Sequence, residues 1–101
     1  MIEGVNMDNV DLDKDVKEVV NLLKENGCKK IYLFGSIVNG KFKKDSDIDV
    51  AISGLEPRKF IMVYSKIMMT VDRKVDLVDL DDTEDYFVKN VLNKEELVEV
   101  E

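Results

Sequence analysis

Residues 29–53 read KKIYLFGSIVNGKFKKDSDIDVAIS, and this stretch decides the fold. A buried strand over Ile31–Phe34 ends in a glycine–serine turn, and the chain returns as a second strand over Ile48–Ser53. Successive side chains on a strand point to opposite faces of the sheet, so Asp47 and Asp49 share one face while the apolar residues beside them enter a core. The stretch therefore predicts a small sheet with two carboxylates on one face.

The turn and the two carboxylates favour a particular chemistry. Neighbouring carboxylates repel each other unless a cation lies between them, and Mg²⁺ prefers oxygen ligands that substrate phosphates often complete. Gly35 and Ser36 offer backbone N–H groups and a hydroxyl to phosphate oxygens, and glycine lets the backbone approach closely. Only ten residues separate Ser36 from Asp47. A phosphate-binding turn and a metal-binding pair this close together indicate nucleotide chemistry.

The rest of the chain predicts helices around a small mixed sheet, an α/β (α+β) fold. Residues 1–10 are expected to form a flexible N-terminus and residues 11–101 a single domain. Apolar residues at helical spacing follow Asp11, the expected N-cap, and Gly27 ends that helix. The other expected elements are a helix over Pro57–Val71, a strand over Lys74–Leu80, a helix over Asp82–Asn93 and an edge strand over Leu97–Val100.

The helix expected over residues 57–71 has more apolar residues than one stripe requires. The stripe that covers the sheet comprises Phe60, Val63, Tyr64, Ile67 and Val71, and the sides of the helix carry Ile61, Met62, Met68 and Met69. Either the helix is wedged deeply into the core, or the surplus is exposed as a docking face for another protein. In the last helix the expected buried side comprises Tyr86, Phe87, Val91 and Leu92.

Composition excludes several classes of function. The chain has no histidine, which rules out histidine acid–base catalysis, Ser-His-Asp triads and histidine-ligated metal sites. Its one cysteine, Cys28, is expected to be a small buried hydrophobe. The net charge of −7 argues against a nucleic-acid partner, because phosphate backbones require a basic surface. No signal peptide or apolar run of membrane length is visible, so we expect a cytoplasmic protein with no membrane partner.

The spacing of these motifs resembles that of a known family. Gly35-Ser36, ten further residues, Asp47-Ile48-Asp49 and a later Val75-Asp76-Leu77-Val78 are similar to the core motif of the minimal nucleotidyltransferases (MNT) of the DNA polymerase β-like superfamily. The similarity spans about Lys29 to Leu80, with a weaker helical tail to about Val100. It implies a polymerase β-like nucleotidyltransferase core and metal-dependent transfer of a nucleotide.

The resemblance assigns the metal-binding roles to single positions. Asp47, Asp49 and Asp76 would be the catalytic residues and would hold two Mg²⁺ ions between them. Asp76 is favoured as the third carboxylate because its apolar neighbours in the predicted strand face the core, which turns Asp76 toward the metal side. Asp79 is the alternative.

The resemblance also assigns the phosphate-binding roles. Gly35 and Ser36 would bind the nucleotide phosphates. Many relatives have an arginine just before the second glycine of the turn, where this chain has Asn39. That phosphate contact is therefore either lost or taken over by nearby cations, for which the candidates are Lys41, Lys43 and Lys44.

The acceptor is implied only by the resemblance. Stand-alone enzymes of this type are similar to the MntA-type antitoxins of MNT/HEPN toxin–antitoxin systems, a family that transfers AMP from ATP to a tyrosine of a HEPN ribonuclease toxin. We therefore expect protein adenylyltransferase activity (AMPylation) with ATP and Mg²⁺, an antitoxin role and a HEPN-type toxin as partner. Two alternatives stay open, a non-catalytic module that neutralises a partner by contact and a nucleotidyltransferase that modifies a small molecule.

A calcium-binding loop is the competing interpretation of the carboxylates. Asp45-x-Asp47-x-Asp49 partly matches an EF-hand, whose sixth position requires a glycine for its sharp bend. Val50 occupies that position, and the apolar residues around it favour a strand. Calcium sensing is therefore disfavoured.

Overall fold

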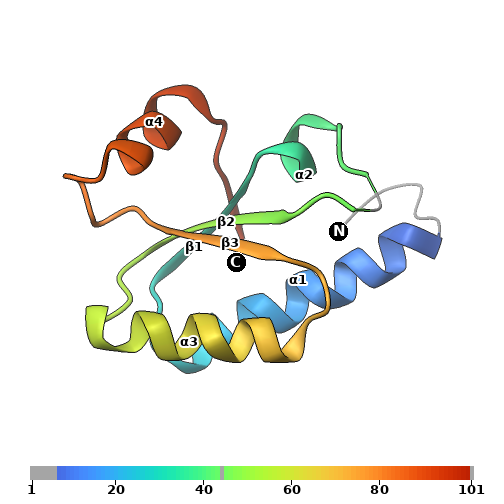
Figure 1. Cartoon of the computed structure of the whole chain (residues 1–101), viewed down its shortest axis with the longest axis horizontal. Coiled ribbons are helices and arrows are strands. Elements are labelled where there is room, and N and C mark those ends of the chain that lie inside the picture. The colour runs from blue at the N-terminus through green and yellow to red at the C-terminus, as the bar shows by residue number, and fades with distance from the viewer. Residues whose placement is uncertain (1–6, 44, 101) are drawn as a thin grey trace.

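A four-stranded mixed sheet with the strand order β3-β2-β1-β4 runs through the middle of the molecule (Figure 1). The computed structural model describes residues 7–43 and 45–100. Strand β1 (Lys30–Phe34) pairs antiparallel with β2 (Ile48–Ser53) and with β4 (Val98–Val100), whereas β2 pairs parallel with β3 (Val75–Asp79). The predicted mixed sheet and α/β fold class are therefore confirmed, with β3 and β4 at the two edges.

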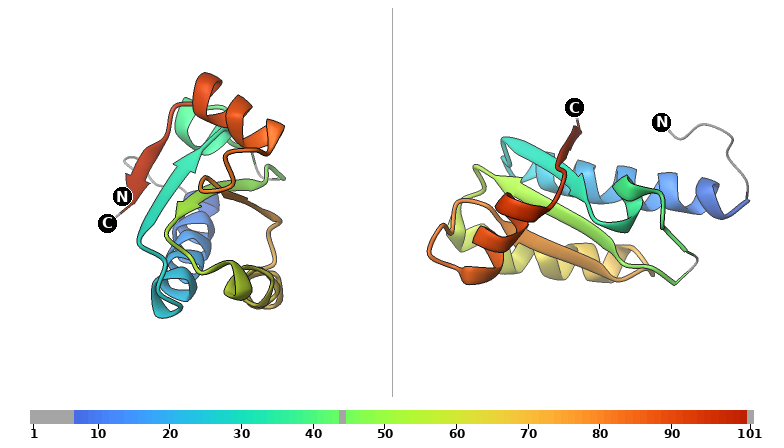
Figure 2. Two further views of the ribbon diagram at one scale, coloured as in Figure 1. Left: turned by 90° about the vertical axis from the view of Figure 1, so that its left-hand side faces the viewer. Right: turned by 90° about the horizontal axis from the view of Figure 1, so that it is seen from above.

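Helices cover both faces of this sheet (Figures 1 and 2). Helices α1 (Met7–Glu25) and α3 (Pro57–Thr70) lie side by side on one face, and α4 (Tyr86–Lys94) lies on the other. A four-residue helix, α2 (Ser36–Asn39), follows β1 directly and contacts both β1 and β2. None of the helices that the structure describes has the length and apolar character needed to cross a lipid bilayer.

The alternation of side chains along the strands produces two separate apolar clusters. The larger cluster lies between the sheet and helices α1 and α3, and it receives Ile48, Val50 and Ile52 from β2. The smaller cluster lies under α4 and includes Ala51 from the same strand together with Val88. The division matters for the site, because Asp49 and Asp76 project from the thinly covered α4 face.

Helix α1 begins earlier than the sequence predicts. The sequence predicts a flexible N-terminus over residues 1–10, but the chain is helical from Met7 onward, and residues 1–6 lie outside the described part. Asp11 therefore lies inside α1 and is not its N-cap. The C-terminal end is as predicted, since α1 stops at Glu25 and Gly27 adopts a left-handed φ of 89°. Cys28 is buried in the larger cluster, as predicted, and burial raises the pKa of its thiol.

The surplus apolar residues of α3 are exposed, so the helix is not wedged deeply into the core. Its buried residues are Val63 and Ile67, while Met69 is 84% exposed and Ile61 70% exposed. Met62 and Met68 are also exposed. Because the sheet is narrow and α1 packs beside α3, only one stripe of α3 finds a surface to cover.

The predicted buried side of the last helix is wrong at three of four positions. Val91 is buried, but Tyr86, Phe87 and Leu92 are exposed, and Val88 takes the second buried position. The helix starts at Tyr86, with Asp85 as its N-cap accepting a hydrogen bond from the Phe87 N–H. A nine-residue helix over a small cluster buries one stripe only, so the aromatic residues of its first turn stay exposed.

Candidate active site

The strand register aligns the candidate site residues across three strands. Asp49 of β2 pairs with Phe34, the residue directly before the Gly35 turn, and on its other side with Asp76 of β3. Asp47 comes just before the start of β2, next to Ile48, whose N–H donates to the carbonyl of Lys74, the residue just before β3. The structure therefore brings the predicted turn and carboxylates to one end of the sheet.

Asp49 is harder to ionise than an isolated aspartate. Burial raises the pKa of Asp49 to about 6, with further contributions from the negative charges of Asp76 and then Asp47. Hydrogen bonding with the Asp76 side chain also favours the protonated form of Asp49 and contributes to its raised pKa. Perturbed carboxylates of this kind are characteristic of functional sites, because the arrangement opposes stability unless a cation compensates it.

A cation that the sequence analysis did not single out lies between two of these carboxylates. The Lys74 ammonium is 3.8 Å from an oxygen of Asp47 and 3.8 Å from an oxygen of Asp76. Its side chain is 68% exposed, so the two contacts stabilise the fold only weakly. The available signal was the alternation of the strand, since a lysine two residues before Asp76 projects from the same face.

Gly35 is required by its contact with Asp49. Its φ of 74° is unfavourable for other residues, and a Cβ placed on it would overlap the Oδ2 atom of Asp49. Any side chain at this position would push the Asp49 carboxylate away. Ser36 follows as the half-buried first residue of α2, so the predicted turn is the junction between β1 and this short helix.

Two of the three predicted lysines lie in the loop that joins α2 to β2. Lys41 and Lys43 are exposed, and Lys44 lies outside the described residues. The Lys41 N–H donates to the Asn39 side chain at 3.0 Å, so Asn39, which replaces the arginine of many relatives, shapes this loop. The structure therefore leaves the ammonium groups of Lys41 and Lys43 in solvent, without a fixed contact to the carboxylates.

The donor set fits a hard divalent cation such as Mg²⁺. Carboxylate oxygens are the ligands that Mg²⁺ prefers, and a bound cation would favour the ionised form of Asp49, whose pKa is raised first by burial and then by the charges of Asp76 and Asp47. Within residues 7–43 and 45–100, no three acidic or cysteine side chains lie close enough together to hold a metal ion by themselves. Mg²⁺ usually keeps water or substrate oxygens among its ligands, so the three aspartates would supply only part of its coordination. The calcium-loop alternative is wrong, because residues 48–53 are paired within the sheet.

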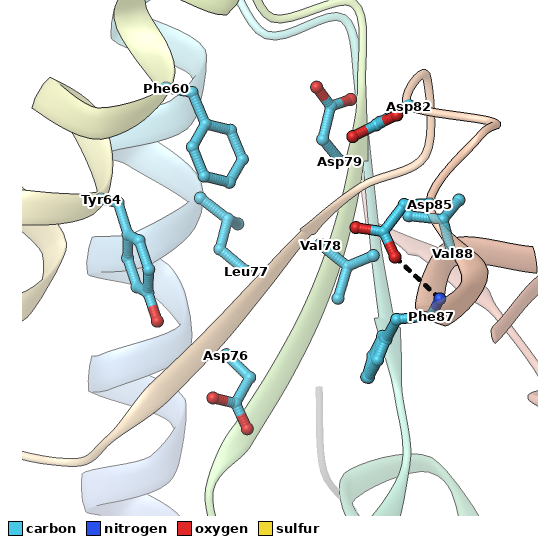
Figure 3. A pocket seen from close by; sticks show the side chains of 10 residues that line it. All are labelled: Phe60, Tyr64, Asp76, Leu77, Val78, Asp79, Asp82, Asp85, Phe87 and Val88. Carbon is cyan, nitrogen blue, oxygen red and sulfur yellow. Dashed lines mark hydrogen bonds between the residues drawn. The ribbon is translucent and has the colours of Figure 1, made fainter. Parts of the chain in front are cut away.

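A cleft of about 540 Å³ adjoins the carboxylates along the edge strand β3 (Figure 3). Asp76 lies at one end of it, Phe60 and Tyr64 of α3 line one wall, and Phe87 of α4 lines the other. The Tyr64 hydroxyl donates to the Val75 carbonyl at 3.0 Å, which fixes the ring against β3. Sequence reasoning missed this cleft because it assigned Phe87 to the core.

The sequence of this chain matches a known protein family over most of its length. Residues 17–100 match the family described as "Polymerase beta, Nucleotidyltransferase", which is most of the chain. The chain belongs to the polymerase β-like nucleotidyltransferase family. The matched span includes both the Gly35-Ser36 turn and all three carboxylates, so this nucleotidyltransferase domain carries the whole candidate site.

Individual relatives point in the same direction. The Methanocaldococcus jannaschii protein named "Putative protein adenylyltransferase MJ0604" is 47% identical over 45 residues, which are 42% of this chain and 45% of that protein. The chain thus spans less than half of that relative. A toxin–antitoxin crystal structure with AMP-PNP matches at 29% identity and a TM-score of 0.61, covering 80% of this chain and 69% of the other.

A second toxin–antitoxin structure concerns the partner. It is a tri-AMPylated Shewanella oneidensis HEPN toxin in complex with an MNT antitoxin, and its matched chain is 27% identical with a TM-score of 0.58. The match covers 84% of this nucleotidyltransferase and 69% of that chain. This chain is thus a minimal nucleotidyltransferase whose structural neighbours are MntA antitoxins.

Proposed function

We propose that this chain is a metal-dependent protein adenylyltransferase that transfers AMP from ATP to a tyrosine of a HEPN-type toxin and so acts as an antitoxin. The observation that carries the proposal is the pairing of Asp49 with Asp76 across β2 and β3. Beside this pair lies Gly35, where any side chain would overlap the Asp49 carboxylate. Similarity to toxin–antitoxin structures with AMP-PNP and with an AMPylated toxin supports the choice of nucleotide and acceptor.

The roles of the residues follow from their positions. Gly35 and Ser36 would bind the phosphates of ATP at the end of β1, while Asp47, Asp49 and Asp76 would hold Mg²⁺. Mg²⁺, when bound, neutralises phosphate charge and acts as a Lewis acid in transfers of this kind. Lys74, already beside Asp47 and Asp76, adds a mobile positive charge at the same place.

The transfer itself is a displacement at the α-phosphorus. The tyrosine oxygen forms a bond to that phosphorus, the bond from the phosphorus to the bridging oxygen breaks, and pyrophosphate leaves. The Asp76 carboxylate would accept the proton of the tyrosine hydroxyl, since it lies at the open end of the site next to the cleft. Positioning of the two substrates supplies much of the rate in such reactions.

The test is intact-mass spectrometry of the co-purifying or genomically adjacent partner protein, after incubation with ATP, Mg²⁺ and the chain. We expect the partner to gain the mass of one or more AMP groups, and we expect Asp47→Asn to abolish the gain while the circular dichroism spectrum stays native. A partner that gains no mass from the native chain would overturn the proposal.

The contact-only alternative has one observation in its favour. The exposed apolar face of α3, which comprises Ile61, Met62, Met68 and Met69, is suited to protein docking. A stable, stoichiometric complex that blocks the toxin without any AMP transfer would support that alternative. Small-molecule modification would instead show as ATP turnover that requires no protein partner.

A further inference from the structure

The cleft along β3 and the Gly35 turn lie on opposite sides of the candidate carboxylates. The strand order places the Gly35 turn of β1 first, Asp49 of β2 next and Asp76 of β3 last, and the cleft starts at Asp76 and extends along the edge strand. Displacement at a phosphorus is in line, so the attacking hydroxyl enters opposite the leaving pyrophosphate. With the phosphates on the β1 side, the acceptor must arrive from the β3 side.

The walls of the cleft suit an aromatic side chain. Phe60 and Tyr64 pack edge to face with their ring centroids 6.1 Å apart, and Phe87 faces them from α4 (Figure 3). Phe87 is 53% exposed although it is a large apolar residue, so its ring is available to a ligand. Aromatic rings favour edge-to-face and offset contacts with further rings, which a tyrosine acceptor would supply.

The charge of the cleft discriminates between the two substrates. Beyond Asp76 its rim carries Asp79, Asp82 and Asp85, and none of the described residues that line it is a lysine or an arginine. A triphosphate would be repelled by this rim, whereas a cationic group would be attracted. The cleft is therefore unsuited to the nucleotide and suited to a positively charged segment.

We infer that this cleft is the acceptor site and that it takes a polypeptide segment in which a tyrosine is flanked by lysine or arginine. The tyrosine ring lies between the aromatic walls with its hydroxyl toward Asp76, and the flanking cations face Asp79 and Asp82. This inference rests on the proposed function for the chemistry, but the binding preference stands on the cavity, its aromatic walls and its charge alone.

Binding is measured separately from transfer, so that the two proposals can fail separately. Two short synthetic peptides, each with one fluorescently labelled end and a central tyrosine, carry flanking lysines in one case and flanking glutamates in the other. Fluorescence anisotropy with the full chain, Mg²⁺ and AMP-PNP should show the lysine peptide binding at least about tenfold more tightly. Transfer of AMP from ATP to the same peptides is then followed by mass spectrometry.

A matched pair of variants locates the binding. Asp82→Lys reverses a charge on the rim of the cleft, and Glu84→Lys makes the same charge change two residues away, outside the cleft. We expect Asp82→Lys to weaken the lysine peptide by about three- to tenfold and to strengthen the glutamate peptide, with a much smaller effect of Glu84→Lys. Both residues are exposed, so neither change should disturb folding.

The outcomes are distinct. Equal binding of the two peptides, or equal effects of Asp82→Lys and Glu84→Lys, would overturn the inference, as would tighter AMP-PNP binding by Asp82→Lys alone, which would place the nucleotide in the cleft. A lysine-peptide preference that depends on Asp82, without any AMP transfer to peptide or protein, would uphold the cleft and count against the proposed function.

Discussion

Asp49 and Asp76 lie directly opposite each other on two adjacent parallel strands, β2 and β3. Burial and the neighbouring Asp76 carboxylate raise the pKa of Asp49 to about 6, and Asp47 adds to the effect. The ionised form of Asp49 therefore lowers the stability of the fold. Such a loss of stability is expected where carboxylates are arranged to bind a cation, since the arrangement is unfavourable only while the cation is absent.

The first prediction concerns the stability of the metal-free chain. Because Asp49 is destabilised when ionised, Asp49→Asn should raise the melting temperature in EDTA at neutral pH by about 2–5 °C. The measurement is differential scanning fluorimetry, with Glu84→Gln as the control for loss of one exposed negative charge. A melting temperature of Asp49→Asn below that of the native chain would contradict the electrostatic account.

The second prediction is the pH dependence of that difference. The folded pKa of Asp49 is about 6 against an ordinary value of 3.8, so between these two values the folded chain binds more protons than the unfolded chain. The contribution of Asp49 to stability therefore falls as pH rises through this range. The gain in the free energy of unfolding from Asp49→Asn should grow from pH 4 to pH 6 and then level off. A gain that stays constant over this range would be the contrary result.

The third prediction concerns Gly35. Gly35→Ala should abolish AMP transfer, because the new Cβ would displace the Asp49 carboxylate. Gly40→Ala is the control, since Gly40 also has a positive φ, 83°, but no atom near its added Cβ. Gly40→Ala should lose about 1 kcal/mol of stability from its left-handed conformation, and Gly35→Ala should lose more, because the ψ of −145° at Gly35 lies in a region that is essentially restricted to glycine. Only Gly35→Ala should also lose activity. Equal activity of the two variants would argue against the contact.

The fourth prediction concerns Lys74. Lys74→Met removes the ammonium that lies 3.8 Å from both Asp47 and Asp76. The two carboxylates are then left without this competing cation, so Mg²⁺ or Mn²⁺ should bind the nucleotide-free chain about three- to tenfold more tightly. Isothermal titration calorimetry measures the change. Lys66→Met, on the exposed side of α3, removes the same charge far from the carboxylates in sequence and should leave metal affinity unchanged.

The fifth prediction separates the two sides of α3. Ile67 is fully buried whereas its neighbour Met68 is 63% exposed. Ile67→Ala should therefore cost about 2–5 kcal/mol of unfolding free energy, and Met68→Ala less than about 0.5 kcal/mol. Urea denaturation of the isolated chain gives both values. Similar losses for both variants would mean that the exposed face is covered by other chain segments in solution.

Much of the fold and site was predictable from local patterns. The β1–turn–β2 unit follows from a period-two alternation interrupted by Gly35, and the same alternation turns Asp76 toward Asp49. The sequence could not show how much of the surface of each helix is buried. Tyr86 and Phe87 are large hydrophobic residues and would be assigned to the core by their type. They are exposed because the apolar cluster under α4 is too small to include them.

The position of Lys74 was hidden for a different reason. A lysine at the start of a strand is ordinarily a solvated residue, and its contacts with Asp47 and Asp76 depend on the parallel register of β2 and β3. The cleft likewise joins α3, β3 and α4, which are separate in the chain. Strand alternation indicated only the face from which Lys74 projects, and no local pattern indicated the cleft.

The central claim, that Asp47, Asp49 and Asp76 form the catalytic centre, is tested most directly by comparing Asp76→Asn with Asp79→Asn. Rates of AMP transfer from ATP to the HEPN-type partner are measured by intact mass under single-turnover conditions. We predict that Asp76→Asn slows transfer at least about a hundredfold, whereas Asp79→Asn stays within about tenfold of the native rate. A native rate in Asp76→Asn, or the larger loss in Asp79→Asn, would contradict the account.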